Sequence, residues 1–190
     1  MIGHNRGPAF GPGRGFRTHA WKQARRALLP QMPLEIVRIR VKRAQELGLP
    51  YKTYATVRAT TGRDIVAFLF SSNALRLVKP TDQLPPDRAT RLRQIRHCRT
   101  TLGVLPPADP AGMGARLLSE GIEAASFRAP TLRHSWAETR DILKTALASQ
   151  NLPADGVFVI GETMLEADWP AAANLAGYLP AAEYFSDPRP

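Results

Sequence analysis

The chain has 190 residues with 26 Lys and Arg against 16 Asp and Glu, so its formal charge is +10. An apolar content of 44% argues against wholesale disorder, and a single cysteine, Cys98, excludes an internal disulfide framework and a cysteine-rich zinc module. The longest unbroken apolar run, residues 65–70, is far too short to cross a membrane. We therefore expect a soluble, cytoplasmic protein with no membrane contact.

The charge is divided unevenly along the chain. Residues 1–100 carry 20 Lys and Arg against 5 Asp and Glu, whereas residues 101–190 carry 6 against 11. A half-chain with a net charge of +15 favours a polyanionic partner. The acidic half is typical of an ordinary soluble domain.

Composition and breaker residues predict four segments. The predicted fold class is mixed, α+β or α/β, with a basic helical N-terminal domain joined to a small α/β C-terminal domain. The segments are a flexible basic arm (1–20), a helical domain (21–80), a Pro-rich linker with an Arg-rich helix (81–103), and a small acidic α/β domain (104–190).

In the basic half the pattern predicts helices in succession. Residues 21–29 form a short helix that ends before Pro30. Residues 37–42 alternate apolar and charged side chains as a strand does, but a helical spacing of apolar residues extends over 34–48 and favours a helix. A second helix covers 51–60, and a capping box at Thr61 opens a third over 63–78.

The rest of the chain predicts an Arg-rich helix and then a βαβ unit. The Arg-rich helix starts at Asp87 and ends near Gly103. Strand, helix and strand within about forty residues indicate the βαβ unit. The expected elements are a helix over 112–119, a strand over 122–127, a helix over 135–150 capped by Ser135 and Glu138, a strand over 156–160, and a last helix from Asp168.

The stretch from Val41 to Val57 resembles the helix-turn-helix of bacterial DNA-binding proteins. Ala44 stands four residues before Gly48, and Tyr54 follows at helical spacing. A plain helical hairpin and a strand-containing arrangement remain open alternatives. The predicted contacts to phosphates and base edges are Arg40, Lys42, Arg43, Lys52, Thr53, Thr56 and Arg58.

The segment 87–102 extends this basic surface. Its five arginines would bind phosphates through their charge, or else belong to a solvated connecting helix. They are Arg88, Arg91, Arg93, Arg96 and Arg99. Cys98 lies among them and is interpreted as a passive cysteine.

The loop after the first strand of the acidic half is a third candidate site. A helix N-terminus near basic side chains can hold a phosphate or carboxylate, and Arg128, Arg133 and Ser135 are the predicted anion-binding residues. His134 and Glu162 could act there as acid or base. The alternative is a surface loop with ordinary capping.

The first third of the chain is similar to a group of bacterial proteins of unknown function. Those proteins begin with Met-Ile-Gly-His-Asn-Gly-Gly-Pro, and this chain has Arg6 where they have the glycine after Asn. The likeness continues through the Ala-x-x-x-Gly-Leu-x-Tyr-x-x-Tyr stretch over 44–54. It implies a bacterial origin and supplies no site residues.

These observations lead to three hypotheses for function. The first is a regulatory DNA-binding protein, with DNA favoured over RNA as the partner. In this hypothesis the α/β domain senses a ligand or self-associates, and self-association would give a homodimer. The second is a small α/β enzyme or nucleotide-binding protein for an RNA or other phosphate-bearing substrate, and the third is a basic adaptor for an acidic protein. P-loop, dinucleotide-binding and His-Glu-x-x-His motifs are absent, so no cofactor or metal is predicted, and enzymatic activity is left open.

Overall fold

The computed structural model describes residues 32–186, which form a mixed α/β fold. Within this range, the residues from 39 onward group as one compact unit. The elements in chain order are α2 (Leu34–Leu47), α3 (Tyr51–Thr61), β1 (Ala67–Ser71), α4 (Pro86–Arg93), β2 (Arg99–Val104), α5 (Pro110–Ser119), β3 (Ala125–Arg128), α6 (Trp136–Ala148), η1 (Ala154–Gly156), β4 (Val157–Gly161), α7 (Met164–Ala167), α8 (Trp169–Ala173), β5 (Gly177–Pro180) and α9 (Ala181–Ser186).

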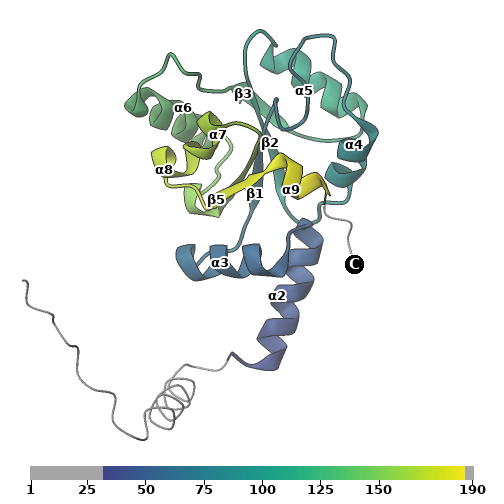
Figure 1. Cartoon of the computed structure of the whole chain (residues 1–190), viewed down its shortest axis with the longest axis vertical. Helices are drawn as coiled ribbons and strands as arrows, with labels where there is room; N and C mark the ends of the chain where they lie inside the picture. The colour runs from purple at the N-terminus through teal and green to yellow at the C-terminus, as the bar shows by residue number, and fades with distance from the viewer. Residues whose placement is uncertain (1–31, 187–190) are drawn as a thin grey trace, which may run out of the picture. The chain divides into compact units, whose positions relative to one another are not determined.

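The five strands form one parallel sheet in the order β3-β2-β1-β4-β5. β1 is central, and Ala67 lies opposite Arg99 of β2 on one side and Val157 of β4 on the other. Parallel strands need crossover connections, which place helices on both faces of the sheet. Helices α4, α5 and α9 lie on one face and α6, α7 and α8 on the other (Figure 1).

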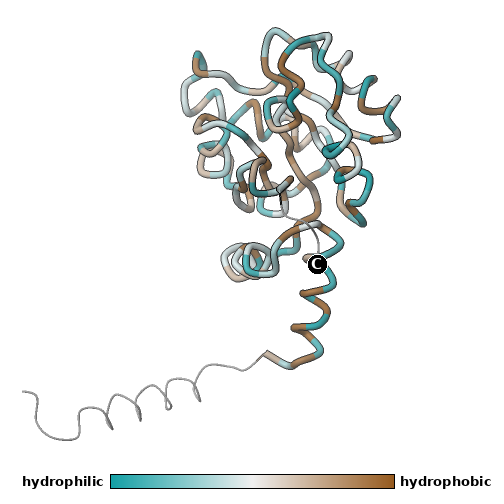
Figure 2. The backbone as a smooth tube through the Cα atoms, turned by 45° about the vertical axis from the view of Figure 1, so that its right-hand side comes forward, coloured by the Kyte–Doolittle hydropathy of each residue, from teal (hydrophilic) through white to brown (hydrophobic). Residues whose placement is uncertain are grey.

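Each face of the sheet has its own apolar core. All five residues of β1 are buried, and alternate residues enter different cores. Phe68 and Phe70 pack in the core beside α4 and α9, while Leu69 packs with Leu143 of α6 and Trp169 of α8. Figure 2 shows the hydrophobic stretches gathered along the central strands. The sheet is therefore buried on both sides, as expected of a parallel sheet.

Several local predictions are confirmed. The mixed α/β class is confirmed, and helices occur where they were expected over 34–48 and 51–60. Gly62 ends α3 with a φ of 69°, a left-handed conformation that suits glycine. The capping box of Ser135 and Glu138 opens α6 as predicted. These features depend on residues a few positions apart in the chain, so they can be predicted from the sequence.

The predicted helix over 63–78 is wrong. Its centre is β1, and Ser71 ends the strand before a series of turns. A short apolar run that is buried on both faces has no polar alternation, so periodicity alone cannot separate it from a buried helix. The middle of the segment expected to be helical is therefore the central strand of the sheet.

The predicted Arg-rich helix from Asp87 to Gly103 is also wrong in extent. α4 ends at Arg93, His97 adopts a φ of 52°, and β2 begins at Arg99. The strand was not recognised in the sequence because it starts within the arginine-rich segment and only its last four residues are buried. The strand expected over 122–127 starts later, at Ala125, and β5 and α9 follow the short helix α8 without having been predicted.

Two predictions lie outside the described residues. They are the flexible basic arm over 1–20 and the helix over 21–29.

Candidate ligand site at the carboxyl edge

The strand order reverses between β1 and β4. From β1 the chain passes through α4 to β2, whereas β4 is reached only after β3 and α6. The loops that leave β1 and β4 therefore diverge at the carboxyl edge of the sheet. Open parallel sheets bind their ligands at such a point.

A buried carboxylate joins these two loops. Glu166 has no solvent exposure, and its Oε2 accepts hydrogen bonds from the backbone N–H groups of Glu162 at 2.5 Å and Thr163 at 2.9 Å. Its Oε1 accepts a hydrogen bond from the Asn73 Nδ2 group at 2.9 Å. Three donors thus surround one carboxylate, and the loop after β1 is tied to the loop after β4.

Gly161 allows this close approach. A Cβ atom at this position would lie 2.7 Å from Tyr178 Cε2 and 2.8 Å from Glu166 Cβ, closer than real Cβ contacts. A side chain here would push Glu166 away from the loops it joins. The glycine at the end of β4 is therefore explained by packing at the site.

A pocket of about 530 Å³ opens at this edge. Its lining comes from the loops after β1, β2 and β3 and from α7 after β4. The lining residues are Asn73, Leu105, Pro106, Thr131, Leu132, Arg133 and Leu165. Arg133 is the one predicted anion-binding residue among them. Sequence reasoning missed Asn73 and Thr131, although each polar residue closely follows a strand.

His134 lies against one wall of the pocket. The backbone N–H of Thr131 donates to His134 Nδ1 at 2.9 Å, and the Thr131 hydroxyl lies 3.1 Å from the same nitrogen. Because Nδ1 accepts a hydrogen bond, the proton of the neutral ring is on Nε2. His134 therefore orders the loop through one nitrogen and keeps the other as a donor.

The N-terminus of α6 is occupied by its own side chain. Glu138 Oε2 accepts from the Ser135 backbone N–H at 2.7 Å, and the Ser135 hydroxyl accepts from the Glu138 backbone N–H at 3.3 Å. The hydrogen bond from the Ser135 backbone, and after it the interaction with the Ser135 side chain, hold the pKa of Glu138 below its ordinary value. Arg128 Nη1 instead donates to the Ala108 carbonyl at 2.6 Å. Ser135 and Arg128 are therefore committed to structural contacts.

The α2–α3 segment has the packing expected of a helix-turn-helix. Ala44, Leu47, Leu49 and Tyr54 are buried, and Gly48 adopts a φ of 67° in the turn. The same packing also suits a plain helical hairpin, so it does not by itself identify DNA binding.

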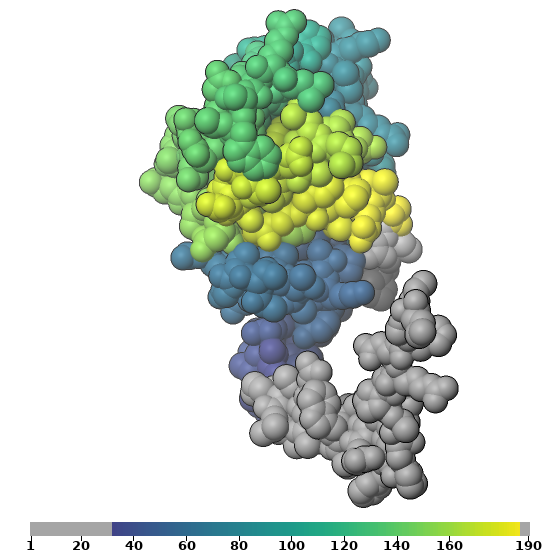
Figure 3. Space-filling model, turned by 60° about the vertical axis from the view of Figure 1, so that its left-hand side comes forward, coloured from purple at the N-terminus to yellow at the C-terminus, as the bar shows by residue number. Residues whose placement is uncertain are grey.

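Three of the four predicted contact residues of α3 lie along a groove. Lys52, Thr53 and Thr56 line one wall of a hollow of about 410 Å³, and the start of β5 with Glu183 lines the other. Figure 3 shows α3 in blue next to the C-terminal segment in yellow. These side chains therefore border a concave surface, whereas a recognition helix enters the major groove with a convex one.

Arg43 is the centre of a structural network. Its guanidinium donates to the carboxylates of Asp64 at 2.9 Å and Glu46 at 3.2 Å. It also donates to the backbone carbonyls of Ile65, Arg96 and His97. Burial lowers the pKa of Arg43, whereas the carboxylates of Asp64 and Glu46 raise it, and the net shift is a rise. Because its guanidinium donates to these five acceptors within the protein, Arg43 has a structural role.

The remaining predicted cations of this half do not form one surface. Lys42 is exposed on α2, and Arg40 and Arg58 are partly buried. Arg88 is buried, and Arg91 donates to the Gly48 carbonyl at 2.8 Å.

Further along, Arg93 pairs with Glu120 at 2.8 Å. Arg99 donates to the backbone carbonyls of Gln150 and Asn151. Arg96 is exposed. The five arginines therefore point to different parts of the fold, and phosphate binding by them stays a prediction.

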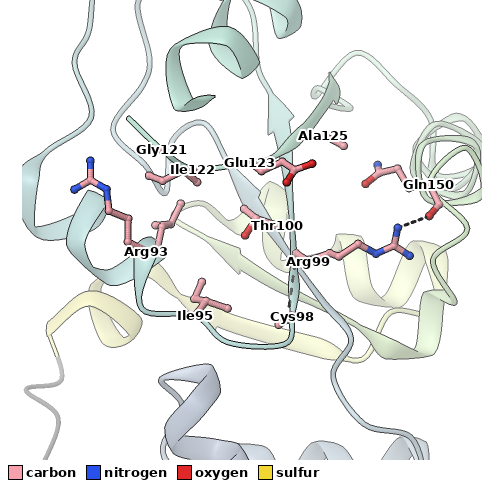
Figure 4. Close-up of a pocket in the computed structure, with 11 residues that line it drawn as sticks. Arg93, Ile95, Cys98, Arg99, Thr100, Gly121, Ile122, Glu123, Ala125 and Gln150 are labelled. Carbon is pink, nitrogen blue, oxygen red and sulfur yellow. Dashed lines mark hydrogen bonds between the residues drawn. The ribbon is translucent and has the colours of Figure 1, made fainter. Parts of the chain in front are cut away.

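Cys98 borders a second pocket, of about 460 Å³, at the opposite edge of the sheet (Figure 4). Arg93 and Arg99 stand at its two sides and Glu123 lies between them. Burial, more than any charge nearby, raises the pKa of the Cys98 thiol to about 12. The thiol is therefore protonated near neutral pH, as expected of a passive cysteine.

Within residues 32–186, no three His, Cys, Asp or Glu side chains are placed to hold a metal ion together. No helix in this range has the length and apolar character of a membrane span. Comparisons with protein-family models, curated proteins and solved structures gave no match for this chain.

Proposed function

We propose that the protein binds a small molecule with a negatively charged group in the carboxyl-edge pocket. The observation that carries this proposal is the convergence of loops from four strands on one pocket, at the edge where parallel sheets bind ligands. Its volume of about 530 Å³ suits a small molecule. This proposal develops the second of the three functional hypotheses.

The lining indicates what kind of molecule fits. Leu105, Pro106, Leu132 and Leu165 form apolar walls, and Leu132 is 86% exposed at the rim. Asn73 and Thr131 offer hydrogen bonds, and Arg133 offers a positive charge. A ring or other apolar part would cover the walls while a phosphate faces Arg133. A sugar phosphate or nucleotide has this combination.

Thermal unfolding with four probes tests the proposal. AMP and glucose 6-phosphate carry a ring and a phosphate, adenosine lacks the phosphate, and inorganic phosphate lacks the ring. We expect a ring-bearing phosphate to raise Tm by about 3–6 °C at ten times its Kd, more than either partial probe. Arg133→Ala should remove the advantage of the phosphate.

Arg140→Ala is the matched control. Arg140 is an exposed arginine of α6 that pairs only with its neighbour Asp141 among the described residues, and it does not line the pocket. This variant should respond to every probe as the wild type does. Equal responses of Arg133→Ala and Arg140→Ala, or no response to either ring-bearing phosphate at millimolar concentration, would overturn the proposal.

Binding of duplex DNA by the α2–α3 segment is a second candidate function. It is supported by the buried residues of the turn and by the exposed cations Lys42 and Lys52 on the two helices. A fluorescence-anisotropy titration with a short DNA duplex should give affinity that falls steeply with salt. Lys52→Ala should weaken binding, whereas Lys144→Ala on α6 should not. Undetectable binding at about 50 mM salt would exclude this function.

A further inference from the structure

Arg88 is a buried arginine, and two of the three nitrogen atoms of its guanidinium have no hydrogen-bond partner among the described residues. It is the third residue of α4 and is 4% exposed. Within the described part of the chain, its Nε and Nη1 atoms have no hydrogen-bond partner, and no ion pair holds it. Its guanidinium carbon lies 4.6 Å from the centre of the Phe185 ring of α9. Among the described residues, this ring is the group in direct contact with the charge.

The environment makes this arrangement costly. A buried charge without a partner is strongly unfavourable, and most side chains avoid it by losing or gaining a proton. Arginine cannot do so, because its guanidinium stays protonated in proteins. Burial and the neighbouring Arg76 lower the pKa of Arg88, and the charges of Asp87 and Glu162 oppose this. Such an unsatisfied group calls for an explanation.

The order of the elements places Arg88 near the carboxyl edge, because α4 begins after the loop that leaves β1 and Arg88 lies in its first turn. Arg76 belongs to the loop after β1, and Glu162 follows β4 directly. Both are exposed, so they can turn without disturbing the core. Arg88 therefore lies on the same side of the sheet as these two loops, and Arg76 adds a second positive charge there.

We propose that Arg88, assisted by Arg76, binds an oxyanion, the phosphoryl or carboxylate group of a ligand, between the loops after β1 and β4. The anion supplies the acceptors that Arg88 lacks, and a guanidinium desolvated in advance forms strong charge-assisted hydrogen bonds. Phe185 holds the guanidinium plane in position. This site involves none of the residues lining the 530 Å³ pocket.

Thermal unfolding of the full chain in phosphate, at ionic strength matched with NaCl, tests this site. Inorganic phosphate should raise the Tm of the wild type saturably. Arg88→Met removes the buried charge and keeps the volume, so it should abolish this rise and leave the phosphate-free Tm equal to or above that of the wild type. Arg91→Met is the control, because Arg91 also stacks on an aromatic ring but donates to the Gly48 carbonyl.

Arg91→Met should lower the phosphate-free Tm and retain the phosphate response. Arg76→Ala, at an exposed position, should weaken phosphate binding several-fold without changing the fold, and it tests the site if Arg88→Met does not fold. Arg133→Ala should keep the response, which separates this site from the pocket of the proposed function. The inference is overturned if the wild type shows no saturable rise, if Arg88→Met retains it, or if Arg76→Ala leaves it unchanged.

Discussion

The carboxylate of Glu166 provides the sharpest test of how the carboxyl edge is held together. Glu166→Ala removes three hydrogen bonds to a charged acceptor, from Glu162 N–H, Thr163 N–H and Asn73. Such bonds contribute about 1.5–3 kcal/mol each, but solvent can reach part of the opened loop. We expect a loss of about 4 kcal/mol in the free energy of unfolding.

Glu166→Gln should cost much less. The amide oxygen can accept from the two backbone N–H groups, and the amide NH₂ then faces Asn73, which can turn its own amide to accept. All three hydrogen bonds persist, each weakened by about 1 kcal/mol because the acceptor is neutral. The lower cost of burying an uncharged group offsets part of this, so the expected loss is about 1–2 kcal/mol.

Urea denaturation at constant m-value measures both losses, with Glu123→Ala as an exposed control. A double-mutant cycle with Asn73→Ala should give a coupling of about 1–2 kcal/mol with Glu166→Ala, because the two side chains are bonded. If Glu166→Gln were as damaging as Glu166→Ala, hydrogen-bond geometry would not explain the effect. A loss below about 1 kcal/mol for Glu166→Ala would refute the reasoning altogether.

Three further predictions follow from the shifted pKa values. Hydrogen bonds from Ser135 lower the pKa of Glu138, so its carboxylate stabilises the fold above its ordinary pKa of 4.5 and this stabilisation is lost as the pH falls. In a plot of the urea midpoint against pH, Glu138→Gln should therefore reduce the fall on the acid side. Burial, and then the hydrogen bond to Asp64, raises the pKa of Tyr54 to about 12. The protonated phenol therefore stabilises the fold fully below its ordinary pKa of 10, and this contribution is lost as the pH rises through about 12. Tyr54→Phe should remove this late step from a tyrosinate absorbance titration, and an unchanged titration would contradict it. At about pH 8 the thiolate fraction of Cys98 should be on the order of 10³-fold below that of an ordinary cysteine. A thiol reagent should therefore react much more slowly with the folded protein than with the urea-unfolded protein. Similar rates in the two states would be inconsistent with the burial of Cys98.

The local patterns of the chain were sufficient for much of its secondary structure. The helices over 34–47 and 51–61 follow from apolar spacing and from glycines that end them. The capping box at Ser135 and the buried strand β4 were equally visible. Each of these depends on residues a few positions apart, so tertiary contacts are not needed to recognise it.

The candidate site was only partly visible. Arg133 was predicted because a basic residue precedes a helix, and the pocket contains it. Asn73 was hidden, because the apolar run before it was interpreted as a helix. Arg43 was assigned to phosphate binding because its charge is visible in the sequence, while its partner Asp64, 21 residues later, is not. Arg88 resembles its exposed neighbours in sequence, and only packing against Phe185 sets it apart.

The net charge illustrates the same limit. The sequence alone divides the chain near Val104 into a half of +15 and a half of −5. In the structure, β1 comes from the basic half, β2 spans the boundary, β3, β4 and β5 come from the acidic half, and all five belong to one sheet. Charge is a property of each residue, whereas strand order results from burying apolar side chains that are distant in the chain. For this reason composition predicted a polyanionic partner for the basic half, whereas only the tertiary structure showed that segments of both halves form one sheet.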